Sequence, residues 1–158
     1  MMNITELFNT FKHKIDWWFK KKCKNYRAAN EADALAWQLY LGWNCDWKMN
    51  SDDKDIVFEG TKEGIKANTE RNRLLEKLEN IFVSEQKEGG EPTTESLAMC
   101  IDKAIITYMK IINCKSENRI KELQKQLDYI LINADKLYND IMSGKKNIIT
   151  FSHMKDYM

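Results

Sequence analysis

The sequence has few of the residues that make turns. Its 158 residues include a single proline, Pro92, and six glycines. A chain with few turns has long secondary-structure elements, and long elements in a domain of this length are usually helices. We therefore predict one domain, residues 1–158, that is almost entirely α-helical.

Histidines are also few, and closely spaced cysteine pairs and long apolar runs are lacking. Two histidines and four cysteines occur, and no two cysteines have C-x-x-C spacing, which argues against a zinc site. No apolar run approaches the roughly 18–20 residues of a membrane span. The N-terminus lacks the apolar segment of a signal peptide. We expect a cytoplasmic protein with reduced thiols and no membrane association.

The charges nearly balance, with 25 basic and 24 acidic side chains. This balance makes nucleic acid an unlikely partner for the chain as a whole. Residues 1–29, however, hold seven basic and two acidic side chains. We interpret residues 1–27 as an amphipathic helix with a solvated lysine face and an aromatic core face. Contact with an anionic membrane or with nucleic acid is the less favoured alternative.

Apolar residues at steps of three and four predict an all-α bundle of four to five helices. A core at residues 28–145 follows the N-terminal helix, and residues 146–158 form a tail. The clearest break is at residues 84–93, which we interpret as a flexible connection. The predicted helices cover about residues 3–22, 28–47, 56–82, 93–112 and 117–143.

The candidate site residues are acids inside apolar helices. Asp102 has Ile105 and Met109 on its own face, and a buried ionised carboxylate requires a partner. Glu95 stands seven residues earlier, which is two turns of a helix that contains both acids. A Mg²⁺ ion would relieve their repulsion. The alternative, which spacing alone favours, is a salt bridge between Asp102 and a lysine or arginine of a neighbouring helix.

Two further positions have weaker signals. Asp33 shares a helical face with Trp37 and Tyr40, and its ordinary interpretation is a solvent-facing acid at a helix start. The stripe around Arg71 could hydrogen-bond a phosphate or a base, although such stripes more often bridge helices or face water. Nucleophilic catalysis would depend on a histidine, and no catalytic motif surrounds His13 or His153.

Three segments, in order along the chain, resemble helices of an uncharacterised bacterial family of all-α proteins related to the MazG-like nucleotide pyrophosphohydrolases. They are Asn30–Leu39 (NEADALAWQL), Lys62–Leu78 (KEGIKANTERNRLLEKL) and Thr94–Ile111 (TESLAMCIDKAIITYMKI). The resemblance covers roughly residues 28–145, and a long closing helix that ends near Gly144 agrees with it. The family's closing motif has only a faint echo in residues 154–157.

This resemblance implies a MazG-like bundle in which inward acids hold Mg²⁺ beside a nucleoside triphosphate. Water activated by the metal would attack a phosphorus atom and release pyrophosphate. The implied metal ligands are Asp33, Glu95 and Asp102. The implied nucleotide- and phosphate-contacting residues are Lys62, Asn68, Arg71 and Asn72.

The chain also departs from the family's pattern. The Glu-Asp pair that follows the family's W-H-L segment is replaced by Tyr40 and Leu41, and Gln38 stands in place of the histidine. Two function hypotheses follow. One is a Mg²⁺-dependent nucleoside-triphosphate pyrophosphohydrolase or a catalytically degenerate relative. The other is a non-catalytic protein that sequesters a nucleotide or inhibits a protein partner, and a small protein encoded by a phage or mobile element would fit this hypothesis. We also expect a homodimer, because five helices leave apolar surface uncovered.

Overall fold

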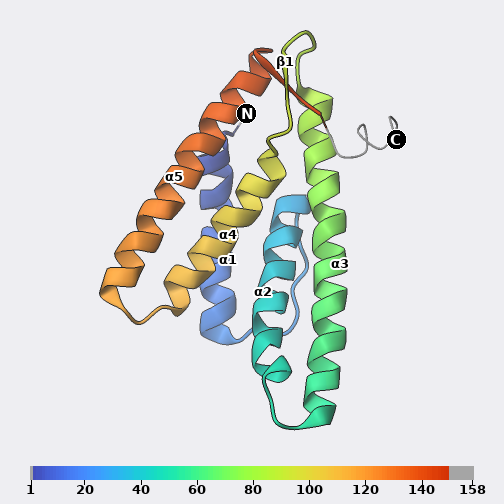
Figure 1. Ribbon diagram of the computed structural model, residues 1–158, viewed down its shortest axis with the longest axis vertical. Helices are drawn as coiled ribbons and strands as arrows, with labels where there is room; N and C mark the ends of the chain where they lie inside the picture. The colour runs from blue at the N-terminus through green and yellow to red at the C-terminus, as the bar shows by residue number, and fades with distance from the viewer. Residues whose placement is uncertain (1, 150–158) are drawn as a thin grey trace.

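The computed structural model describes residues 2–149 and shows a helical bundle closed at one end by a pair of short strands (Figure 1). The all-α prediction is confirmed. In chain order the elements are α1 (Ile4–Lys21), α2 (Glu31–Met49), α3 (Lys54–Glu85), β1 (Glu91–Thr93), α4 (Leu97–Asn113), α5 (Glu117–Met142) and β2 (Lys146–Ile148). No helix within residues 2–149 is long and apolar enough to cross a membrane.

Polar side chains fix where the helices begin, because they accept hydrogen bonds from first-turn N–H groups. Asn3 caps α1, whose start agrees with the helix predicted from about residue 3, and the Asn3 side chain accepts from the Glu6 backbone N–H. Ser116 caps α5 in the same way. Gly144, with φ +81°, follows the end of α5, which confirms the predicted stop.

The start of α4 differs from the prediction. The helix begins at Leu97, because Ser96 accepts from the Met99 backbone N–H and residues Glu91–Thr93 form β1. Glu95 therefore lies in the connection before α4. The prediction that Glu95 and Asp102 share one helical stripe is wrong.

The connection between α3 and α4 is held by the C-terminal segment. β1 pairs in parallel with β2, so that Pro92 lies opposite Asn147. Gly90 permits the close approach, since a Cβ there would lie 2.7 Å from the Gly144 carbonyl oxygen. Part of the predicted tail is thus strand β2. Residues 150–158, which include His153 and the 154–157 echo, lie outside the described residues.

The core lies around α4, which packs against α1, α2, α3 and α5. The apolar seam of α5 points into the same core, where Leu127, Ala134 and Ile141 are buried. The aromatic face of α1 joins it through Phe11 and Trp18. Most of the apolar surface that suggested a dimer at the sequence level is therefore covered within one chain.

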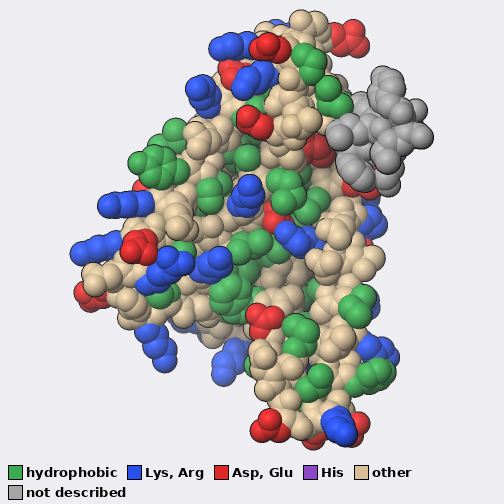
Figure 2. All heavy atoms as spheres, viewed as in Figure 1, with side chains coloured by type: hydrophobic (Ala, Val, Ile, Leu, Met, Phe, Trp, Pro, Cys, Tyr) green, Lys and Arg blue, Asp and Glu red, His purple; other side chains and the backbone are tan. Residues whose placement is uncertain are grey.

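Helices α2 and α3 form an antiparallel hairpin that extends beyond the other helices (Figure 1). Their backbones approach closely at Gly60, where a Cβ would lie 2.5 Å from the Lys48 Cβ. We call residues 49–58, which join the two helices at the free end, the hairpin tip. Hydrophobic side chains lie among charged ones on this end of the molecule (Figure 2).

Candidate functional site

Asp102 is fully buried on α4 and is paired with an arginine of α3. Arg71 donates from Nε to Oδ1 at 2.8 Å and from Nη2 to Oδ2 at 2.6 Å. Only 1% of the Asp102 side chain is exposed, against 25% of Arg71. These charge-assisted bonds raise the pKa of the Arg71 guanidinium above its ordinary value. The salt-bridge alternative that the sequence left open is thus confirmed.

Asp33 is buried as well, at the start of α2. Its Oδ2 accepts from the Tyr26 hydroxyl at 2.5 Å and from the Ala29 backbone N–H at 2.9 Å. The Lys14 ammonium lies 3.3 Å from the same oxygen. The interpretation of Asp33 as a solvent-facing acid is wrong. Its carboxylate joins α1, the α1–α2 connection and α2, and its Oδ1 has no hydrogen-bond partner among the described residues.

A third buried acid, Glu79, was not singled out from the sequence. Its Oε2 accepts from the Ser96 hydroxyl at 2.5 Å and from the Ala98 backbone N–H at 3.0 Å. The carboxylate of α3 thereby neutralises the N-terminus of α4. The signal was available, because Glu79 follows Leu78 on the apolar face of α3 and Phe82 comes three residues later.

The predicted magnesium ligands do not converge. Glu95 is exposed, and Arg71 occupies both oxygens of Asp102. In the range 2–149 no group of three or more histidine, cysteine, aspartate or glutamate side chains could hold a metal ion. Mg²⁺ requires several oxygen ligands in near-octahedral geometry. The residues present therefore do not fit the ion that the resemblance implies.

The predicted nucleotide-contacting residues all lie on α3, but they do not form one binding surface. Arg71 turns toward Asp102, and its Nη1 donates to Asn68 Oδ1 at 3.4 Å. Lys62 holds its ammonium over the Phe58 ring, 5.4 Å from the centroid. Asn72 is exposed.

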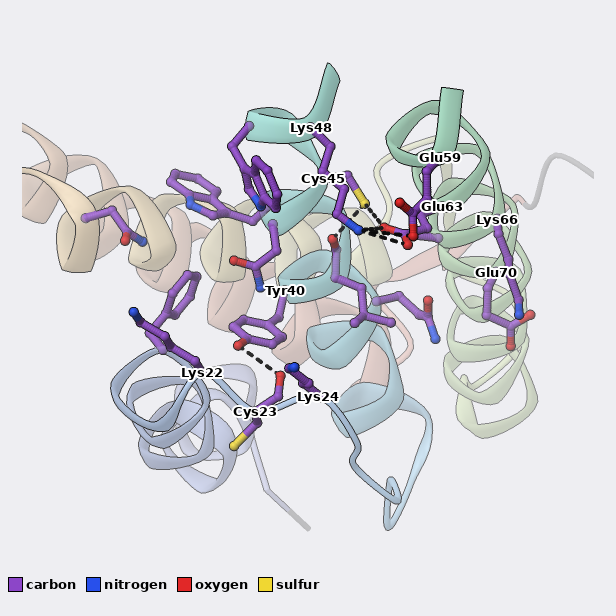
Figure 3. Close-up of a pocket in the computed structure, with 18 of the residues that line it drawn as sticks. Lys22, Cys23, Lys24, Tyr40, Cys45, Lys48, Glu59, Glu63, Lys66 and Glu70 are labelled. Carbon is purple, nitrogen blue, oxygen red and sulfur yellow. Dashed lines mark hydrogen bonds and ion pairs between the residues drawn. The ribbon is translucent and has the colours of Figure 1, made fainter. Parts of the chain in front are cut away.

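A different site is open at the other side of α3. A groove of about 1600 Å³ lies between the end of α1, α2 and the first half of α3 (Figure 3). Lysines, glutamates and aromatic rings line it together. The charged side chains are Lys22, Lys24, Lys48, Lys66, Glu59, Glu63 and Glu70, and the aromatic ones are Phe19, Tyr40, Trp43 and Trp47.

The acids of the groove have cationic partners. Lys48 Nζ bonds both carboxylate oxygens of Glu63, at 3.1 and 3.0 Å, and lies 3.7 Å from Glu59. Glu70 accepts from Arg73 Nε at 2.9 Å, and this bond lowers the pKa of the Glu70 carboxyl.

Three lysines of the groove remain without an ion-pair partner among the described residues, and they are Lys22, Lys24 and Lys66. Lys48 is shared by Glu59 and Glu63, and Glu70 is paired with Arg73. The lining as a whole has four lysines against three glutamates, so the unpaired ammonium groups leave a small excess of positive charge. The groove therefore presents a net positive potential to a ligand.

The aromatic wall of the groove comes from α1 and α2. Trp47 is 64% exposed, whereas Trp43 packs edge-on against Phe19. Tyr40 is buried, and its hydroxyl hydrogen is shared between the Trp18 carbonyl at 3.0 Å and the Cys23 carbonyl at 3.1 Å. Figure 3 shows the bond to Cys23. Tyr40 thus holds the end of α1 beside the groove.

Sequence reasoning missed this groove, although its components are visible in the chain. The lysines of residues 20–24 were interpreted as part of the solvated face of an N-terminal helix, and no binding role was predicted for Trp43 or Trp47. The extension of the α2–α3 hairpin beyond the bundle leaves these residues facing an open space.

Comparison of the chain with protein-family models, curated proteins and solved structures gives no match. The resemblance to the MazG-like proteins therefore stays a prediction that rests on three segments.

Proposed function

We propose that this chain is a non-catalytic binding protein whose groove holds an acidic, partly apolar helical segment of a partner protein. The observation that carries the proposal is the combination of Lys22, Lys24 and Lys66, which lack ion-pair partners within residues 2–149, with the exposed ring of Trp47. Unpaired cations favour an anionic partner, and an exposed indole ring gains free energy when apolar surface covers it.

The size of the groove favours a protein segment over a small molecule. Small-molecule sites usually measure roughly 300–1,000 Å³ and enclose most of the ligand. The groove is larger, at about 1600 Å³, and is open along one side. A helix with its side chains is about 10 Å across. A groove between packed helices is a common receptor for the apolar face of such a helix.

The buried acids support a binding role over hydrolysis. Asp102 and Asp33 are both held by cations of the same chain, and Glu79 caps a helix. Freeing Asp102 for a metal would leave Arg71 without its partner. The MazG-like pyrophosphohydrolase hypothesis thus stays a prediction with a specific requirement, which is that substrate binding separates Arg71 from Asp102.

Nucleotide sequestration is the second candidate function, and one observation favours it. The same groove combines Trp47, on which a base can stack, with lysines that attract phosphate. This candidate differs from the first in its ligand and uses the same residues.

A direct test measures the binding of fluorescently labelled peptides by anisotropy. The probes are an acidic amphipathic helical peptide, a scrambled peptide of the same composition and a basic amphipathic peptide. We expect saturable binding of the acidic amphipathic peptide alone. Lys24→Glu/Lys66→Glu should weaken it about tenfold or more. Lys121→Glu/Lys125→Glu, on the exposed side of α5, is the matched control and should leave it unchanged.

The outcomes separate the candidates. Binding of the scrambled peptide with equal affinity, or binding that the groove substitutions leave intact, contradicts the proposal. Displacement of a fluorescent ATP analogue by unlabelled ATP, without any peptide binding, favours nucleotide sequestration instead.

A further inference from the structure

We infer that in the absence of a partner the groove is filled by the hairpin tip of a second copy of this chain, with each copy donating its tip to the other. This inference rests on the proposed function, because it uses the same groove, and it names what occupies and regulates that groove.

The hairpin tip has the chemistry that the groove accepts. Met49 is 40% exposed and Phe58 is 67% exposed. The acids Asp52, Asp53 and Asp55 accompany one base, Lys54. An exposed apolar patch that is surrounded by charged side chains is typical of a protein contact site. The tip is therefore an acidic, partly apolar segment, of the same class as the proposed ligand.

The charges of tip and groove are complementary. The lining of the groove has four lysines against three glutamates, and Lys24 and Lys66 form no ion pair within the described residues. At the tip, Asp52 and Asp55 have exposed carboxylates that form no ion pair within the described residues. Contact between the two surfaces would bring opposite charges together while covering Phe58 and Trp47.

The tip cannot fill the groove of its own chain. Trp47 and Lys48 line the groove, and the tip begins at the next residue, Met49. The tip is thus the continuation of one wall and points away from the bundle (Figure 1). The occupant must come from another molecule. Since tip and groove adjoin at the same end of the molecule, a two-fold axis permits both contacts at once.

This arrangement makes self-association and partner binding mutually exclusive. A tip seated in the groove covers the lysines that a partner segment would use. Partner binding therefore requires separation of the dimer, and the affinity for the partner falls as the concentration of this chain rises.

Light scattering at micromolar concentrations tests the inference through reciprocal charge reversal. The wild type should have twice the monomer mass of 18.7 kDa. Asp52→Lys/Asp55→Lys at the tip and Lys24→Glu/Lys66→Glu in the groove should each be monomeric. These substitutions leave Asp53, which caps α3, unchanged. An equimolar mixture should form a heterodimer, because the altered tip of one variant then meets the altered groove of the other, and the remaining contact joins a wild-type tip to a wild-type groove.

Lys121→Glu/Lys125→Glu serves as the control and should stay dimeric. Circular dichroism spectra would show whether each variant is folded. A monomeric wild type overturns the inference, and so does a mixture that stays monomeric when both variants are folded. If the wild type is monomeric and still binds the acidic peptide, the proposed function stands and only the dimer is lost. If the wild type dimerises but the monomeric variant Asp52→Lys/Asp55→Lys, whose groove is free, binds no peptide, the proposed function is contradicted.

Discussion

The pairing of Arg71 with Asp102 makes a sharp prediction about stability. In Arg71→Met the Asp102 carboxylate, 1% exposed, loses both of its guanidinium bonds. Breaking one partner of a buried ion pair typically costs about 3–5 kcal/mol. Because a quarter of the Arg71 side chain is exposed and water can reach it, we expect the low end, about 3 kcal/mol.

Two further variants follow from the same geometry. Asp102→Asn should cost less, about 1–2 kcal/mol, because the partly exposed Arg71 can turn to water. Arg71→Met/Asp102→Leu should recover much of the loss, since it removes both charges and fills the same space with apolar atoms. Arg73→Met on the exposed side of α3 is the control. It breaks only the surface pair with Glu70 and should leave stability unchanged within error.

Urea denaturation at neutral pH, followed by circular dichroism, measures these differences. A loss of about 3 kcal/mol lowers the melting temperature of a domain of this length by roughly 6–12 °C. If Arg71→Met is as stable as Arg73→Met, the carboxylate is not buried against the guanidinium. Asp102 would then not be occupied by an internal partner.

Three other predictions concern the rest of the fold. Glu79→Ala should cost about 1–3 kcal/mol in urea denaturation, because it leaves the Ala98 N–H buried without an acceptor, and Glu79→Gln should cost less. Burial and a hydrogen bond to Asp16 raise the pKa of Tyr108 above its ordinary 10.0. The neutral hydroxyl therefore stabilises the fold fully below pH 10, and this stabilisation is lost as the pH rises through the folded-state pKa. In a pH series of urea midpoints, Tyr108→Phe should lose less stability than the wild type at alkaline pH. Gly42→Ala should raise the free energy of unfolding by about 0.5–1 kcal/mol, because alanine favours the helix and nothing beyond the neighbouring helix backbone would lie within 4 Å of the new Cβ. Gly90→Ala should lower the melting temperature, because its Cβ would meet the Gly144 carbonyl. Equal effects of the two substitutions would contradict the β1–β2 contact.

The helices were predictable because their signals are local. Periodic apolar residues and helix caps act over a few residues of the chain. The start of α1 at Asn3 and the end of α5 near Gly144 therefore lie where the sequence places them. The start of α4 was not predictable in this way. It depends on the pairing of residues 91–93 with 146–148, more than fifty residues away, and no periodicity signals a strand of three residues.

The candidate site shows the same division between local and non-local information. Burial of Asp102 follows from its apolar neighbours, but the identity of its partner depends on how α3 packs on α4. Prediction of the groove would require two facts that no single segment of the sequence contains. One is the extension of the α2–α3 hairpin past the bundle, and the other is the neutralisation of Glu63 by Lys48. Only the structure shows that Lys24 and Lys66 face an open space.

We propose that the buried acids stabilise the bundle and that the protein binds a partner without catalysis. Pyrophosphate release from ribo- and deoxynucleoside triphosphates, with Mg²⁺ or Mn²⁺, tests it most directly in the wild type and in Asp102→Asn. We predict no release above the protein-free rate from either. Release by the wild type that disappears in a folded Asp102→Asn would contradict the account and establish a working metal site at the acid that Arg71 now holds.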